Sequence, residues 1–127
     1  MTKIHTSFFA LFFVLLVFSL SSCEKKKSDI LARDWKANKL NLGAVEIGGD
    51  VVSLVYSFKS DATFSRDEDG KVEKGKWQLS DDGKKLILEM ENKARIEKDI
   101  KELTEIKLVL SGEENGMMRE ETFGLKK

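Results

Sequence analysis

The chain has 127 residues, with 22 basic and 22 acidic groups, one His, one Cys and no Pro. This length fits one small domain, and a formal charge of zero argues against a nucleic-acid-binding protein, which usually carries a basic excess. The single Cys excludes an intramolecular disulfide framework and a zinc site built from cysteines. The charges are unevenly placed, because residues 1–22 contain one charged residue, Lys3, and the dense, balanced charge begins after them.

The first segment has the three-part layout of a secretory signal peptide. Lys3 precedes an apolar run over residues 8–20, and the small residues Ser21 and Ser22 follow it. A helix that crosses a bilayer needs roughly 20 apolar residues, so this run is too short for a membrane span. We therefore expect residues 1–22 to be a signal peptide that is cleaved between Ser22 and Cys23.

The cleavage site carries a more specific signal. Leu20-Ser21-Ser22-Cys23 resembles the lipobox of bacterial lipoproteins, which implies that the Cys23 thiol receives a lipid and anchors the protein to a membrane. A reactive thiol or an intermolecular disulfide is the alternative for a lone exported Cys. Residues 23–29 then form the lipidated Cys and a short tether to a domain at 30–127. By resemblance to enteric lipoproteins, Asp directly after the lipidated Cys marks retention in the inner membrane. This chain has Glu24 at that position, which favours the outer membrane and leaves open which face of it.

Turn signals divide the mature chain into short segments. Asp69-Gly70, Asp82-Gly83 and Asn115-Gly116 are the dipeptides that type I′ hairpin turns prefer, because both central residues need a positive φ. Gly48-Gly49 and residues 60–62 provide two further breaks. Turns at this spacing predict an antiparallel all-β domain.

The segments between the turns alternate with the period of two that a half-buried strand requires. A helical turn at residues 28–33 and a bulge near Asn38-Lys39 are also expected. Eight strands with short connections can close into an up-and-down barrel, which removes exposed edges. The predicted strands are 34–42, 51–59, 62–67, 71–79, 85–90, 94–101, 105–111 and 117–123.

Residues 90–107 allow a different interpretation. The stretch from 86 to 110 has no Gly and is rich in helix formers, and Ile96, Ile100, Leu103 and Leu110 fall near a helical stripe. A helix over 90–107 would make the domain α+β. The alternation of Ile106-Lys107-Leu108-Val109-Leu110 favours strands instead.

Several segments together resemble the small lipocalin-like lipoproteins of bacteria, over most of residues 30 to 111. They are Ile30-Leu31 before Trp35-Lys36, the stretches 56–64 and 75–86, and 100–104 with 108–110. The family usually has Gly where Arg33 and Ala62 stand here. The resemblance implies a lipocalin-like barrel in which Arg119 lies over the Trp35 ring. Inward aromatic side chains of such a barrel either fill it or line a ligand cavity, and the candidates are Trp35, Tyr56, Phe58, Phe64 and Trp77.

Catalytic chemistry is poorly supported. The one His, His5, leaves with the signal peptide, and lipid would block Cys23, so the mature domain lacks the commonest general base and a free thiol. The same absence excludes imidazole and thiolate metal sites. We expect no enzyme activity, no catalytic residue, no metal and no cofactor.

Two functions remain open at this stage. In the first, a monomeric, membrane-anchored lipocalin-like protein binds a small apolar ligand in the cell envelope. In the second, the barrel is filled, and the protein is a non-enzymatic interaction or structural module. A cavity of roughly 300 Å³ or more beneath the aromatic rings would favour the first.

Overall fold

The computed structural model describes residues 27–126, apart from the side chain of Asp50. The predictions for residues 1–22 and for Ser22 and Cys23 lie outside these residues. The described part is all-β with one short helix at residues 27–31, where a helical turn was predicted. The strands are β1 Asp34–Leu42, β2 Val45–Gly48, β3 Leu54–Phe58, β4 Thr63–Glu68, β5 Lys71–Leu79, β6 Lys85–Met90, β7 Arg95–Leu103, β8 Lys107–Glu114 and β9 Met117–Leu125.

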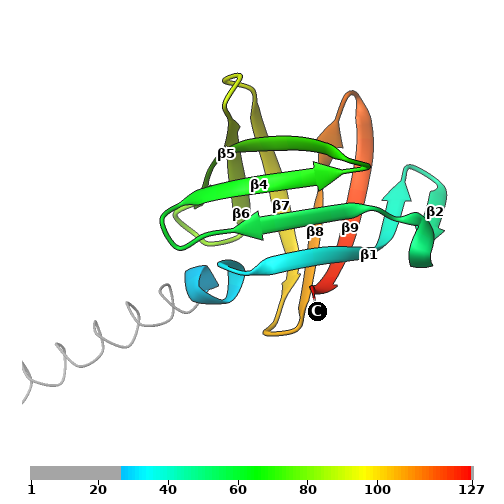
Figure 1. Cartoon of the computed structure of the whole chain (residues 1–127), viewed down its shortest axis with the longest axis horizontal. Helices are drawn as coiled ribbons and strands as arrows, with labels where there is room; N and C mark the ends of the chain where they lie inside the picture. Colours follow the sequence, from blue (N-terminus) through cyan, green and yellow to red (C-terminus); the bar gives the residue numbers. More distant parts are fainter. Residues whose placement is uncertain (1–26, 127) are drawn as a thin grey trace, which may run out of the picture.

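Eight of these strands close into an antiparallel up-and-down barrel, as predicted (Figure 1). They follow one another in the order β1-β3-β4-β5-β6-β7-β8-β9, and β9 pairs back onto β1. The predicted bulge is present, since the β1–β9 register shifts between Ala37 and Lys39. This architecture is consistent with a lipocalin-like fold.

One strand was not predicted. β2 pairs with residues Lys39–Leu42 of β1, whereas residues Asp34–Lys36 of the same strand pair with β3. A 3-10 turn, η1 Gly49–Val51, then leads toward β3, where the prediction had already begun a strand. β2 is four residues long, which is too short to show an alternating pattern in the sequence.

The helical alternative for residues 90–107 is wrong. β6 ends at Met90, a tight turn with Lys93 at φ 70° follows, and β7 and β8 occupy the rest of the stretch. Along β7, Ile96, Lys98 and Ile100 face the interior and the residues between them are exposed. Because the central inward residue is a Lys, the hydrophobicity of the sequence does not show this alternation.

Two of the three predicted hairpin turns have the expected backbone. Asp69-Gly70 and Asn115-Gly116 both have positive φ at the two central residues, as type I′ requires. The third is different, because only Gly83 has a positive φ. Asp82 instead accepts hydrogen bonds from the Ser80 hydroxyl (2.6 Å) and the Lys84 amide (3.0 Å), which stabilises a longer loop.

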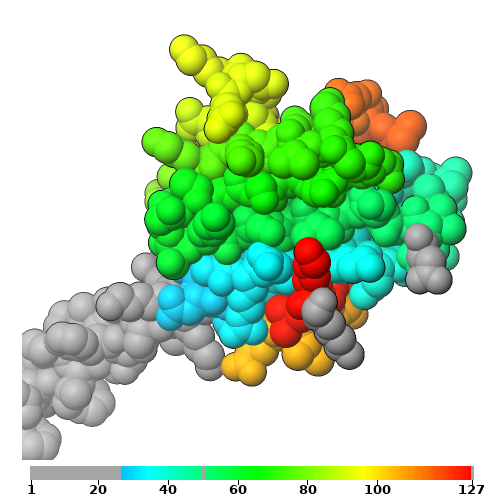
Figure 2. Space-filling model, viewed as in Figure 1, coloured from blue at the N-terminus to red at the C-terminus, as the bar shows by residue number. Residues whose placement is uncertain are grey.

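The barrel has two dissimilar ends. The helix at 27–31 lies at the end where β1 begins, and its Leu31 is fully buried and accepts a hydrogen bond from Trp35 Nε1 at 3.1 Å (Figure 1). We call this the closed end. The opposite end, where the β4–β5, β6–β7 and β8–β9 turns gather, is called the mouth. Figure 2 shows the outer surface of β3–β5 between the two.

Candidate functional site

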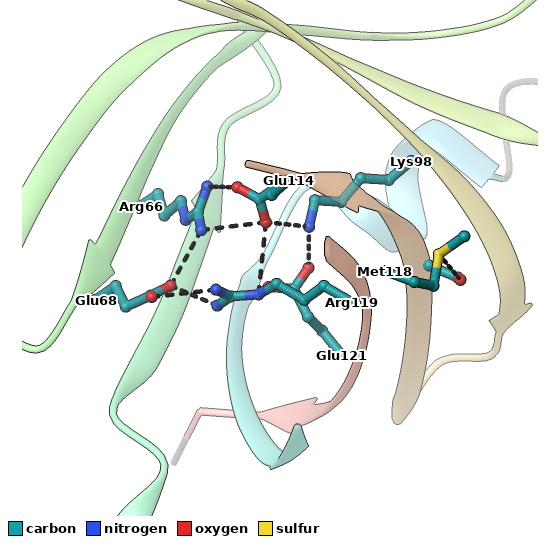
Figure 3. A network of polar contacts seen from close by, with 8 residues as sticks. Arg66, Glu68, Lys98, Glu114, Met118, Arg119 and Glu121 are labelled. Atoms are coloured by element: carbon teal, nitrogen blue, oxygen red, sulfur yellow. Dashed lines mark hydrogen bonds and ion pairs between the residues drawn. The ribbon is translucent and has the colours of Figure 1, made fainter. Parts of the chain in front are cut away.

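Six charged side chains point into the mouth half of the barrel and form one connected network (Figure 3). They occupy inward positions of β4, β7, β8 and β9, in the same alternation that places Phe64 and Phe123 in the core nearer the closed end. Their charges balance, with three cations and three carboxylates. This ionic cluster consists of Arg66, Glu68, Lys98, Glu114, Arg119 and Glu121.

The carboxylate of Glu114 contacts all three cations of the cluster. Arg66 Nη1 lies 2.7 Å from its Oε1, and Lys98 Nζ lies 2.9 Å from its Oε2. Arg119 Nε is 3.4 Å from the same Oε2. Burial works to raise the pKa of Glu114, but the charge of Lys98 and the hydrogen bond from Arg66 outweigh it and lower this pKa to about 2.

The other two carboxylates complete the cluster. Glu121 pairs with Lys98, and the side chains of both residues are fully buried. Glu68 accepts hydrogen bonds from Arg66 at 3.0 Å and from Arg119 at 3.2 Å. Burial opposes the ionised form of Glu68, yet the hydrogen bonds from Arg119 and Arg66 prevail and lower its pKa. Glu68 and Glu114 are therefore ionised at neutral pH.

Two buried polar groups next to the cluster have no hydrogen-bond partner among the described residues. They are Arg66 Nε and the hydroxyl of Tyr56. The Arg66 guanidinium lies over the Tyr56 ring, 5.7 Å from its centroid, so these two residues are in contact where the apolar and charged halves of the barrel join. Burial raises the pKa of Tyr56 well above its usual value, which keeps its hydroxyl protonated and able to donate.

A hollow of about 680 Å³ opens above the cluster at the mouth. Four members of the cluster contribute charged groups to its wall, Arg66, Glu68, Glu114 and Arg119, and the charged residues around them are Asp69, Lys71, Glu73, Arg95 and Glu113. Its apolar surface comes from five side chains, which are Leu42, Met90, Ala94, Ile96 and Met117.

The predicted cavity residues pack against one another near the closed end. Tyr56 stacks on Phe58 with ring centroids 5.3 Å apart, and Phe64 lies 6.4 Å from Tyr56. Trp77 meets Phe58 edge-on at 5.6 Å, and Trp35 is fully buried. The five rings share one core cluster, so the space beneath each is taken up largely by other side chains.

Trp77 alone among the five also borders a surface hollow, of about 700 Å³, outside the closed end. Its indole Nε1 donates to the Lys59 carbonyl at 2.9 Å, and the ring is 7% exposed. The surrounding wall comes from the start of the helix at 27–31 and from the β5–β6 loop at 80–83. This hollow is separate from the mouth.

The predicted stacking of Arg119 on Trp35 is wrong. Arg119 lies opposite Leu42 in the β1–β9 register, whereas Trp35 lies opposite Leu125 at the other end of these strands. The Arg119 guanidinium binds Glu68 and Glu121 instead. The cation that lies over an aromatic ring is Arg66, over Tyr56.

Comparison with known proteins adds no family. No protein-family model matches the chain, and no curated protein matches it. Within residues 27–126, no group of three or more His, Cys, Asp or Glu is placed to hold a metal ion. No helix in that same range is long and apolar enough to cross a bilayer.

Proposed function

We propose that this protein is a lipid-anchored, non-enzymatic binding protein of the bacterial cell envelope that holds a small molecule at the mouth of its barrel. The observation that carries the proposal is the hollow of about 680 Å³ above the ionic cluster. Ligand pockets in proteins span about 300–1,000 Å³ and combine apolar walls with a few fixed polar groups. The mouth has both kinds of surface.

The tether supports an orientation for the mouth. Cys23 precedes the helix at 27–31 by four residues, a distance that extended chain covers in at most about 14 Å. That helix lies at the closed end. A lipid on Cys23 would therefore hold the closed end near the membrane and direct the mouth away from it. Glu24 in place of Asp favours the outer membrane for this anchor.

Native mass spectrometry of residues 24–127, purified from the envelope of the protein's own host, tests the ligand. We expect a reproducible bound mass of a few hundred daltons. Met117→Trp should abolish it by filling the hollow, and Met118→Trp is the matched control. The two methionines are neighbours with similar exposure, 51% and 58%, but only Met117 lines the hollow. A mass retained equally by both variants would move the ligand away from the mouth, and its absence from the wild type would refute the proposal.

The anchor has its own test. Metabolic labelling with a palmitate analogue should mark the wild-type protein and not Cys23→Ser, because the serine hydroxyl does not replace the thiol in lipid attachment. Ser22→Ala keeps a small residue before the cleavage site and should remain labelled. Label on Cys23→Ser would remove the lipoprotein assignment and leave the ligand proposal standing.

A filled-barrel interaction module is the second candidate. Its support is the packing of the aromatic rings, since Trp35, Tyr56 and Phe123 are fully buried in one core cluster. This candidate predicts that no small molecule is found at the mouth and that envelope proteins crosslink to the barrel surface. The mass spectrometry described above separates the two.

A further inference from the structure

We propose that the mouth binds the carboxylate of a small aliphatic acid, and that Glu114 occupies the position which this carboxylate takes. The inference rests on the proposed function and names the ligand class of the same site. Its basis is the geometry of the ionic cluster around Glu114, together with two buried donors that the chain leaves without an acceptor.

The cluster is built around one carboxylate. Arg66, Lys98 and Arg119 approach Glu114 from three different strands, at 2.7, 2.9 and 3.4 Å. Without Glu114, these three cations would face two carboxylates, those of Glu68 and Glu121, and the buried site would carry one uncompensated positive charge. A buried charge without a partner is strongly unfavourable. A monocarboxylic acid in its ionised form restores the balance that Glu114 provides.

Glu114 is also the acid of the cluster whose position allows its carboxylate to be exchanged for that of a ligand. It is the last residue of β8, directly before the Asn115-Gly116 turn at the mouth, and it lines the hollow. Glu121, by contrast, has a fully buried side chain inside the barrel. A small movement of the β8–β9 turn would withdraw Glu114 from the cations while β8 and β9 remain paired below it.

The two unpartnered donors point to an acceptor from outside the chain. Arg66 is 5% exposed and Tyr56 is fully buried, and neither Arg66 Nε nor the Tyr56 hydroxyl has a partner among the described residues. Arg66 Nε can only donate and the Tyr56 hydroxyl is able to donate, and the oxygens of a carboxylate are strong acceptors for both. The Glu114 carboxylate reaches neither group from its place on β8, whereas a ligand carboxylate is not fixed to a strand and could bind the same cations with one oxygen turned toward Arg66 Nε.

The walls above the cluster suit a short apolar chain. Leu42, Met90, Ile96 and Met117 line the hollow that opens from the cluster to solvent. An acid whose carboxylate lies among the cations would place its aliphatic part against these side chains. Burial of that part removes apolar surface from water at about 25 cal/mol per Å², so affinity should rise with chain length.

The test measures hexanoate binding by an NMR titration of wild type, Glu114→Ala and Glu105→Ala. Glu114→Ala vacates the carboxylate position and should bind hexanoate at least about tenfold more tightly than wild type, as expected for regained charge-assisted bonds. Glu105→Ala makes the same charge change at an exposed side chain in the β7–β8 turn, outside the lining of the hollow, and should match wild type. Hexanol should show no such gain in any of the three.

The opposite results would overturn the inference. Equal hexanoate affinity of the two variants would mean that Glu114 does not hold the ligand position. An equal gain in affinity for hexanol would mean that the site does not recognise the carboxylate. If Glu114→Ala unfolds, Glu114→Ser also vacates the carboxylate position and keeps a polar side chain there, and acetate should raise its Tm above that in chloride of equal ionic strength. No rise in Tm would count against the site.

The ligand class and the proposed function fail in different ways. A bound molecule without a carboxylate, found at the mouth in the host-purified protein, would refute the carboxylate inference and leave the binding function intact. If no molecule is bound at the mouth and hexanoate does not bind to either Glu114 variant, the carboxylate inference and the proposed binding function are both refuted.

Discussion

Lys98 and Glu121 form a fully buried ion pair across the interior of the barrel. They lie on β7 and β9, which are separated in the sheet by β8. The pair therefore links two strands that share no backbone hydrogen bonds. It also shows that the mouth half of the barrel is held by charge, where the closed half is held by apolar packing.

Loss of one partner should be far more harmful than loss of both. Lys98→Met leaves Glu121 buried with Arg119 as its remaining partner, and Glu121→Gln leaves Lys98 with Glu114. We expect each single variant to lower the free energy of unfolding by about 3–5 kcal/mol. The double variant Lys98→Met/Glu121→Met should lose less than the sum. Urea unfolding checks this, and strictly additive losses would show that the two groups do not stabilise one another.

Acid should weaken the domain through Glu114. Its pKa is lowered from 4.5 to about 2 in the folded protein. The stabilisation is therefore fully present above about pH 4.5 and disappears as the pH falls toward 2, because the unfolded state then binds the proton more readily. With a discount for solvent at the mouth, we expect a loss of about 2 kcal/mol.

Unfolding free energies measured from pH 6 to pH 2 check the acid prediction. Glu114→Gln should flatten the curve over this range, and Glu113→Gln should leave it unchanged because the Glu113 side chain is exposed. The same steep acid loss in Glu114→Gln would assign the effect to other carboxylates.

Ala62 has a backbone conformation that favours glycine. Its φ is 72°, in the left-handed region, where a Cβ atom costs about 1–2 kcal/mol. Ala62→Gly removes this cost but makes the unfolded chain more flexible, so we expect a net gain of about 0.5 kcal/mol. Ala44→Gly, at an exposed turn residue with ordinary φ, should instead destabilise. Thermal melts compare the two, and equal losses would mean that the strain at residue 62 is absent.

Gly75 is required by the close approach of two strands. A Cβ atom at this position would lie 2.0 Å from the backbone oxygen of Glu89 on β6, which cannot move aside as a flexible side chain can. We expect Gly75→Ala to lower the unfolding free energy by about 3 kcal/mol. Gly48→Ala is the control, since its nearest contact would be 3.8 Å. Similar small effects of the two substitutions in urea unfolding would contradict the close packing.

Much of the fold could be predicted from the sequence because the apolar side chains and the turns follow simple rules. Tyr56 and Phe58 alternate with polar neighbours, Asp69-Gly70 and Asn115-Gly116 mark turns, and the irregular phase of β1 revealed its bulge. These are local patterns, and they determined the all-β class and the eight-stranded closure.

The candidate site could not be predicted in the same way. Arg66 follows Phe64 in the inward phase of β4, and Lys98 lies between Ile96 and Ile100 in β7, yet a charge at such a position reads as solvent-exposed. The signal was an interruption of alternation in three strands at once. That Glu114 would meet these residues depends on barrel closure, since Arg66 and Glu114 are 48 positions apart.

The most direct test of a ligand site at the mouth is a crystal structure of residues 24–127 purified from the host envelope. We predict a bound molecule in the hollow beside Leu42 and Met117, with an acidic group within hydrogen-bond distance of Arg66 or Arg119. A molecule enclosed among Trp35, Tyr56 and Phe58 instead, or a mouth that holds solvent alone in protein shown to carry a ligand, would contradict the account.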